Sequence, residues 1–249
     1  MREIEFKTGV IRPVECMKEG WELIKDQYWL FFGITFVGML IAGVIPFGIG
    51  IGAMFCGIYF VLLQKMNGRQ VEFGELFKGF EYFVPGLITS LIIIIPAIIS
   101  VVILYGSMIA MFFASIDSRG NVNPAVIWGM FGTLFVEGVI ISLVLGCLHA
   151  LVMFAYPLIV DRKLNGFDAF KLSAKAVWAN LSGVVGIILL EFVMGLIGYM
   201  AFGIGVYFVL PIMFAGVLIA YRKVFPPLNN QFTNQPPPPY SYQEAGNYR

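Results

Sequence analysis

Residues 83–115 of this sequence form an uncharged, predominantly apolar stretch that is longer than one membrane crossing requires. A transmembrane helix needs about 20 mostly apolar residues. Only 12% of the chain is charged, against about 25% in ordinary soluble domains, while 59% is hydrophobic. Because so few charges cannot solvate the surface of a soluble fold of this size, we expect an all-α integral membrane protein.

The apolar runs predict six transmembrane helices, arranged as three hairpins. The expected helices cover about 28–45 and 48–65, 83–115 and 124–160, and 181–199 and 203–221. Pro46 and Gly48 favour the turn inside the first hairpin. Both helices of the second hairpin are longer than the thickness of a bilayer. Three explanations remain open: the helices tilt, a kink occurs at Pro96, or a re-entrant break interrupts a helix.

Lysine and arginine lie mostly on one side of these helices, which predicts that both termini are cytoplasmic. The basic residues on that side include Lys18, Lys25, Lys65, Arg69, Lys78, Arg162, Lys163, Lys171, Lys175, Arg222 and Lys223. The opposite loops contain only Arg119. No cleavable signal peptide is expected, because the charged residues 1–27 contain no continuous apolar core. The predicted location is a cytoplasmic or inner membrane.

A short amphipathic segment precedes each odd-numbered helix. In residues 14–28, 73–83 and 167–177, apolar side chains recur every three or four positions with charged residues between them. Asn165, followed by Asp168, is typical of a helix N-cap. Gly20-Trp21-Glu22 and Gly79-Phe80-Glu81 can be superposed, and Ser173-Ala174-Lys175 matches them loosely. We therefore predict three units, each an interfacial helix followed by a hairpin. The alternative is that any cytoplasmic connector looks amphipathic.

Residues 156–162 (YPLIVDR), followed by 166–173 (GFDAFKLS) and an apolar helix, resemble a family of uncharacterised bacterial six-span membrane proteins. That family is similar to the membrane domain of some glycerophosphodiester phosphodiesterases. The resemblance covers about residues 14–224 and implies a six-helix fold without an assigned activity. Since this sequence contains no phosphodiesterase domain, the resemblance does not imply phosphodiesterase activity.

The predicted domains are a cytoplasmic segment at 1–27, a helical domain at 28–224 and a tail at 225–249. The tail is rich in Pro, Asn, Gln and Tyr, so we expect it to be disordered. Within it, Pro237, Pro238, Pro239 and Tyr240 match the PPxY pattern that WW domains bind. A solvated low-complexity tail is the other interpretation, and the one we favour, because WW domains are scarce in bacteria. The expected partners are the lipid bilayer and, through the tail, a protein.

The sequence contains none of the usual catalytic or metal-binding motifs. Cys16, Cys56 and Cys147 are scattered, and His149 is the only histidine, which argues against a zinc site or any site with two imidazoles. The net charge of +1 gives no reason to expect nucleic acid. We expect no enzymatic activity, metal or cofactor.

Three polar residues inside the predicted helices are the candidate functional residues: Glu137, Glu191 and His149. Ionisable groups at such depth are rare and usually face protein or water. Glu137 and His149 are separated by about 18 Å along one helix, too far for a hydrogen bond. Either the glutamates serve a proton- or cation-linked pathway, or each bonds a neighbouring helix, with Ser142 and Ser182 as possible partners.

The leading hypothesis is a non-enzymatic scaffold or regulatory protein that uses the tail and the interfacial helices as contact surfaces. The competing hypothesis is a small transporter or channel that uses Glu137 and Glu191. An enzyme acting on lipid within the bilayer is a third. A polar cavity around the glutamates would favour transport, and a dry bundle would favour the scaffold.

Overall fold

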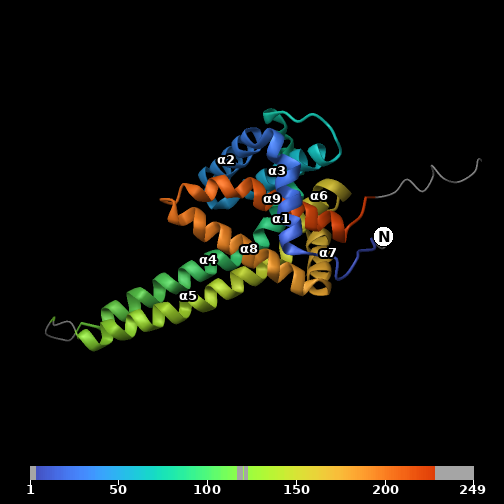
Figure 1. Cartoon of the computed structure of the whole chain (residues 1–249). Helices are drawn as coiled ribbons and strands as arrows, with labels where there is room; N and C mark the ends of the chain where they lie inside the picture. Colours follow the sequence, from blue (N-terminus) through green and yellow to red (C-terminus); the bar gives the residue numbers. More distant parts are fainter. Residues whose placement is uncertain (1–3, 117–119, 121–122, 228–249) are drawn as a thin grey trace, which may run out of the picture.

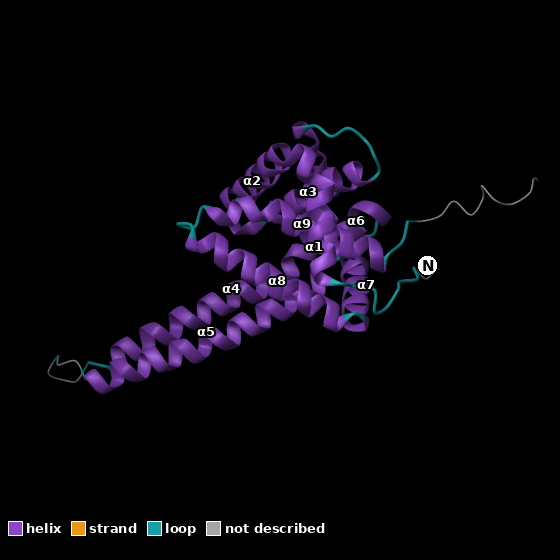
Figure 2. Cartoon of the chain, viewed as in Figure 1, coloured by secondary structure: helices purple, strands orange, loops and turns teal. Residues whose placement is uncertain are grey.

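The computed structural model describes residues 4–116, 120 and 123–227, and these residues form helices with short connections (Figure 1). No β-strand occurs among them, as Figure 2 shows. The helices are α1 (Pro13–Ile24), η1 (Lys25–Gln27), α2 (Tyr28–Val44), η2 (Pro46–Gly48), α3 (Ile51–Met66), η3 (Phe73–Tyr82), α4 (Phe83–Ala114), α5 (Pro124–Val152), α6 (Ala155–Arg162), α7 (Gly166–Ala179), α8 (Leu181–Met200) and α9 (Gly205–Val224). The predicted tail motif, Pro237 to Tyr240, lies outside the described residues.

Five helical stretches are long and apolar enough to cross a membrane: Pro13–Val44, Phe73–Ala114, Pro124–Arg162, Leu181–Met200 and Gly205–Val224. The prediction of an all-helical protein with several membrane-compatible helices is therefore confirmed. The remaining predicted helix, at about 48–65, corresponds to α3, which is apolar but has only 16 residues. It is about 24 Å long, less than the roughly 30 Å of a bilayer core. Five rather than six helices thus meet the length criterion.

The short helix α3 lies at the centre of the bundle. It contacts α2, α4, α6, α9 and η3, and most of its residues are buried. Gly52 allows the backbone of α4 to approach closely at Gly86, and Gly57 does the same for η3. Since other helices surround it, α3 is stabilised by packing inside the protein more than by contact with lipid.

The three predicted amphipathic segments form α1, η3 and α7, which precede the longer helices α2, α4 and α8, with the short η1 between α1 and α2. Asn165 caps α7 as expected, because its Oδ1 accepts a hydrogen bond from the Asp168 backbone N–H at 2.9 Å. Glu72 and Glu75 form a capping box at the start of η3. Each segment lies against another helix: α1 on α9, η3 on α3, and α7 on α4, α5 and α6.

The positions matched in sequence between these segments lie at the helix crossings. A Cβ atom on Gly20 of α1 would lie 2.6 Å from the backbone nitrogen of Gly216 in α9. A Cβ atom on Gly79 of η3 would lie 2.6 Å from the backbone nitrogen of Gly57 in α3. Ser173 of α7 donates a hydrogen bond to the Leu151 carbonyl at the end of α5, at 2.7 Å. The small residues are needed because the backbones approach closely there.

The apolar run at 124–160 forms two helices rather than one. α5 ends at Val152 and α6 begins at Ala155. Pro157 lies in the first turn of α6, where it cannot donate the hydrogen bond that a continuous helix would need. The Phe154 backbone N–H is satisfied instead by the Ser173 hydroxyl, at 3.1 Å. This break turns the chain from the α4–α5 pair into the bundle.

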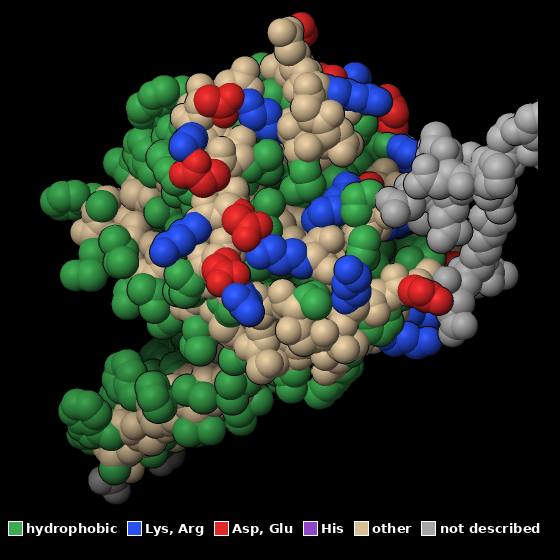
Figure 3. Space-filling model, turned by 45° about the vertical axis from the view of Figure 1, so that its right-hand side comes forward, with side chains coloured by type: hydrophobic (Ala, Val, Ile, Leu, Met, Phe, Trp, Pro, Cys, Tyr) green, Lys and Arg blue, Asp and Glu red, His purple; other side chains and the backbone are tan. Residues whose placement is uncertain are grey.

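The α4–α5 pair projects from the rest of the molecule (Figure 1). The two helices pack on each other, and most of their large apolar side chains are exposed. Figure 3 shows hydrophobic side chains over the visible surface of this pair, whereas acidic and basic side chains are interspersed on the neighbouring face of the bundle. Such a separation of apolar and charged surface is expected when the apolar part lies in lipid.

The two ends of the described chain lie together. The Lys7 backbone N–H donates to the Val224 carbonyl at 2.8 Å, and the Asn180 side chain bonds both the Gly9 N–H and the Lys7 carbonyl. Phe225, which the sequence assigned to the tail, is fully buried, with its ring 6.0 Å from that of Phe6. Packing of the helical domain therefore extends through Phe225.

Candidate functional site

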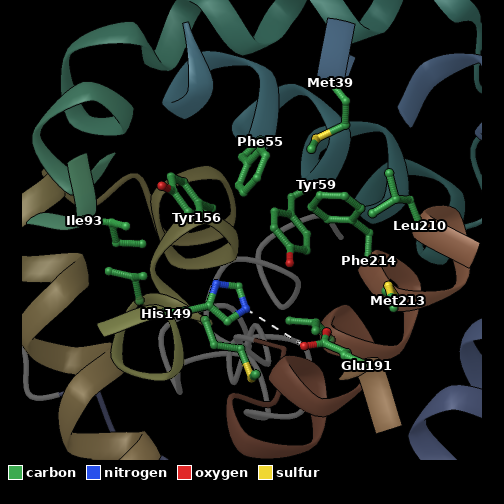
Figure 4. Close-up of a pocket in the computed structure, with 13 residues that line it drawn as sticks. Met39, Phe55, Tyr59, Ile93, His149, Tyr156, Glu191, Leu210, Met213 and Phe214 are labelled. Carbon is green, nitrogen blue, oxygen red and sulfur yellow. Dashed lines mark ion pairs between the residues drawn. The ribbon is translucent and has the colours of Figure 1, made fainter. Parts of the chain in front are cut away.

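A cavity of about 200 Å³ lies where α5 and α8 meet beside α3 and α9 (Figure 4). Its lining is mostly aliphatic, aromatic and methionine side chains. The lining residues are Met39, Phe55, Tyr59, Ile93, His149, Val152, Met153, Tyr156, Glu191, Leu210, Met213, Phe214 and Val217. Two of the three predicted polar residues are therefore brought into one site, although they are far apart in the sequence.

Glu191 of α8 and His149 of α5 face each other in this cavity. The distance from His149 Nε2 to a Glu191 carboxylate oxygen is 3.9 Å, which makes an ion pair only when the imidazole is protonated. The Glu191 side chain is 17% exposed and that of His149 is 55% exposed. No group of the described residues donates a hydrogen bond to the Glu191 carboxylate within normal distance and geometry. An ionised carboxylate in largely apolar surroundings is stabilised when water or a cation lies beside it, and the cavity leaves room for either.

Aromatic rings form the wall of the cavity on the side of α3, α6 and α9. The ring centroid of Phe55 lies 5.2 Å from that of Tyr156 and 5.3 Å from that of Phe214, and Tyr59 lies 5.5 Å from Phe214. All three pairs are edge-to-face, the geometry that aromatic quadrupoles prefer. The Tyr156 hydroxyl is hydrogen-bonded to Ser90 at 3.2 Å. The Tyr59 hydroxyl points toward the space between His149 and Glu191 (Figure 4).

Glu137, the third predicted residue, is not among the residues that line this cavity. It lies in the projecting α4–α5 pair, where it accepts a hydrogen bond from the Ser107 hydroxyl of α4 at 2.7 Å. Neither Ser142 nor Ser182, the partners considered from the sequence, fills this role. Glu137 thus has a partner that explains its presence as a polar link between two helices.

Tyr59 and Tyr156 are lining residues that the sequence reasoning missed. Their signal was a tyrosine inside an apolar helix, a side chain that usually finds a polar partner when buried. The sequence alone could not connect them to Glu191, because that requires knowing which helices pack together. Among the described residues, no group of three or more His, Cys, Asp or Glu side chains could hold a metal ion.

A second polar cluster lies where α6 and α9 end. Asp161 accepts a hydrogen bond from the Tyr221 hydroxyl at 2.6 Å and pairs with both terminal nitrogens of Arg222 at 3.2 Å. Arg162 Nε lies 3.1 Å from the same carboxylate, and this arginine also donates to the Pro226 carbonyl. The cluster connects the two helices to the start of the segment that follows α9.

No family model, curated protein or solved structure matches this chain. The assignment of a function therefore depends on the geometry of the site.

Proposed function

We propose that this chain is a small multi-pass membrane transporter, not an enzyme, in which Glu191 is the binding group. The cavity is mostly apolar and contains Glu191 but not Glu137, so the expectation of a polar cavity around both glutamates is met only in part. The observation that supports transport is that the Glu191 carboxylate faces this cavity and receives no hydrogen bond from the described residues. Glu137 provides the contrast within the same chain, because its carboxylate is bonded to Ser107. A glutamate that served only to fix packing would be expected to resemble Glu137.

In the proposed arrangement the chain crosses the membrane six times, with α3 as the short central crossing. The hydrogen bond from Lys7 to Val224 supports an even number of crossings, because it holds the two ends of the described chain on one side. The distribution of lysine and arginine supports a cytoplasmic location for that side. We place the protein in a bacterial inner membrane on the resemblance of residues 156–173 to the six-span family.

Three repeated units would account for the contacts of the amphipathic helices. α1 packs on α9, η3 on α3, and α7 on the junction of α5 and α6. Each amphipathic helix therefore contacts the second long helix of another proposed unit, and the three contacts close into a cycle. The close approaches at Gly20, Gly79 and Ser173 occupy the matched position in each unit.

Cysteine labelling tests this topology. Phe202, in the almost fully exposed turn between α8 and α9, should become reactive to a membrane-impermeant maleimide in intact cells when changed to cysteine. Asn67→Cys, in the exposed turn after α3, should react only after permeabilisation. Cys147 is replaced by serine in both variants, because it is the exposed native cysteine. The reverse labelling pattern would contradict either the cytoplasmic location of the N-terminus or the crossing of the membrane by α3. Labelling of both sites from outside would contradict the three crossings, α4, α5 and α8, that the proposed arrangement places between the two sites.

Ion flux in proteoliposomes tests the role of Glu191. We expect the wild type to conduct protons or another cation faster than protein-free liposomes do. Glu191→Gln should reduce that flux at least about tenfold. Glu137→Gln is the matched control, since it removes an intramembrane carboxylate outside the cavity, and it should retain the flux. Wild-type flux equal to that of empty liposomes for protons and cations would exclude transport.

The scaffold hypothesis is the second proposal, and a specific observation favours it. Large aromatic side chains on or beside the amphipathic helices are exposed, among them Trp21, Trp29, Phe80, Phe167 and Trp178. Tryptophan and related rings at this level anchor a protein at the membrane interface. With the α4–α5 pair and the tail, these helices would provide contact surfaces for lipid or for a protein partner.

A further inference from the structure

We propose that the Glu191 cavity binds an organic cation, an ammonium nitrogen that carries apolar or aromatic groups. This inference depends on the proposed role of Glu191 as a binding group, and it adds the chemical class of the ligand. The juxtaposition that carries it is one unbonded carboxylate beside four aromatic rings in a partly open, mostly apolar cavity.

The charge of the ligand follows from the ionisable groups around the cavity. Glu191 is the one acidic side chain in the lining, and no lysine or arginine accompanies it. His149 balances the carboxylate only when protonated, and its Nε2 is 3.9 Å away, beyond hydrogen-bonding distance. A cation would compensate Glu191, an anion would be repelled by it, and a neutral apolar molecule would leave it desolvated.

The aromatic rings favour an organic cation over a metal ion. Phe55, Tyr59, Tyr156 and Phe214 present rings around the same space, and the face of a ring attracts a cation by about 0.5–2 kcal/mol. A hard metal ion requires several oxygen ligands. The lining offers the carboxylate and two tyrosine hydroxyls, one of which is already bonded to Ser90. Methionine and aromatic carbon make up most of the remaining wall.

The size of the cavity limits the ligand. Sites for drug-sized molecules have volumes of about 300–1,000 Å³, whereas this cavity has about 200 Å³. It therefore fits one aromatic ring with a small ammonium group rather than a large multi-ring cation. Benzyltrimethylammonium is a suitable probe, and neopentylbenzene, in which carbon replaces the charged nitrogen, is its neutral analogue of equal shape.

The test is equilibrium binding of benzyltrimethylammonium to the full chain in lipid nanodiscs, measured by isothermal titration calorimetry. We expect saturable binding to the wild type and at least about tenfold weaker binding to Glu191→Gln, the loss expected when one desolvated ion pair is removed. Glu137→Gln should bind like the wild type. Phe55→Leu should weaken binding severalfold, while Phe135→Leu, which removes an exposed ring of α5 outside the lining, should bind like the wild type.

Three results would overturn the proposal: no saturable binding to the wild type, equal binding to Glu191→Gln, or equal binding of neopentylbenzene. Thermal unfolding of each variant, followed by the exposure of the buried Cys16 and Cys56 thiols, separates loss of binding from loss of folding. If Glu191→Gln does not fold, the comparison of Phe55→Leu with Phe135→Leu still tests the site. Cation binding without flux would exclude transport but would still support a cation-binding site at Glu191. Proton flux that needs Glu191 without cation binding would support transport and exclude this ligand class.

Discussion

Replacing Asp161 with asparagine is expected to lower the free energy of unfolding by about 3–5 kcal/mol, the usual effect of removing one member of a buried ion pair. The Asp161 side chain is 19% exposed, and its partners Arg162 and Arg222 are 5% and 17% exposed. The substitution leaves two guanidinium groups close together and largely buried without a counter-charge. It also weakens the bond from the Tyr221 hydroxyl, which connects α9 to α6.

Thermal unfolding of purified protein, followed by the reactivity of the buried Cys16 and Cys56 thiols, measures this effect. A loss of 3–5 kcal/mol corresponds to a decrease in Tm of roughly 6–20 °C for a chain of this size. Glu15→Gln is the matched control, because Glu15 pairs with Arg12 at 3.1 Å where both side chains are largely exposed. It should cost less than about 1 kcal/mol. Equal losses in the two variants would show that water screens the Asp161 cluster.

The helices of this protein could be predicted from its sequence because apolar composition and the spacing of charges are local properties. Asn165 illustrates this, since both its side-chain oxygen and the Asp168 N–H that it caps lie within one turn. The ends of α2, α4, α8 and α9 were expected within a few residues for the same reason. The break between α5 and α6 was harder to predict, because Phe154 depends on Ser173 of another helix for its hydrogen bond.

The candidate site could be predicted only in part. Glu191 and His149 were recognisable as polar residues in apolar sequence, but their proximity depends on where α8 crosses α5. The same limitation applies to Glu137, whose partner Ser107 comes from the adjacent helix rather than from its own. Sequence spacing places residues on one face of a helix, and the packing of helix on helix then decides which faces meet.

That packing depends on a few glycines, and Gly57 is one of those where a single added methyl group is expected to have a large effect. A Cβ atom at this position in α3 would overlap the carbonyl oxygen of Leu76 in η3. The obstacle is backbone, which cannot move aside as a flexible side chain can. Gly57→Ala should therefore destabilise the protein by on the order of 3 kcal/mol or more, at the upper end of the usual cost of overpacking.

Gly146→Ala is the matched control, because Gly146 lies in the interior of α5 and a Cβ atom there would meet nothing within 4 Å. Alanine is a better helix former than glycine by about 1 kcal/mol, so this substitution should leave stability unchanged or raise it. Gly57→Ala is thus expected to lower Tm and Gly146→Ala is not, as measured by the exposure of the buried thiols. If Gly57→Ala unfolds at the wild-type temperature, the close crossing of η3 over α3 does not stabilise the fold. The crossing of α1 over α9, where Gly20 and Gly216 leave similarly little space, would then not be expected to stabilise the fold either.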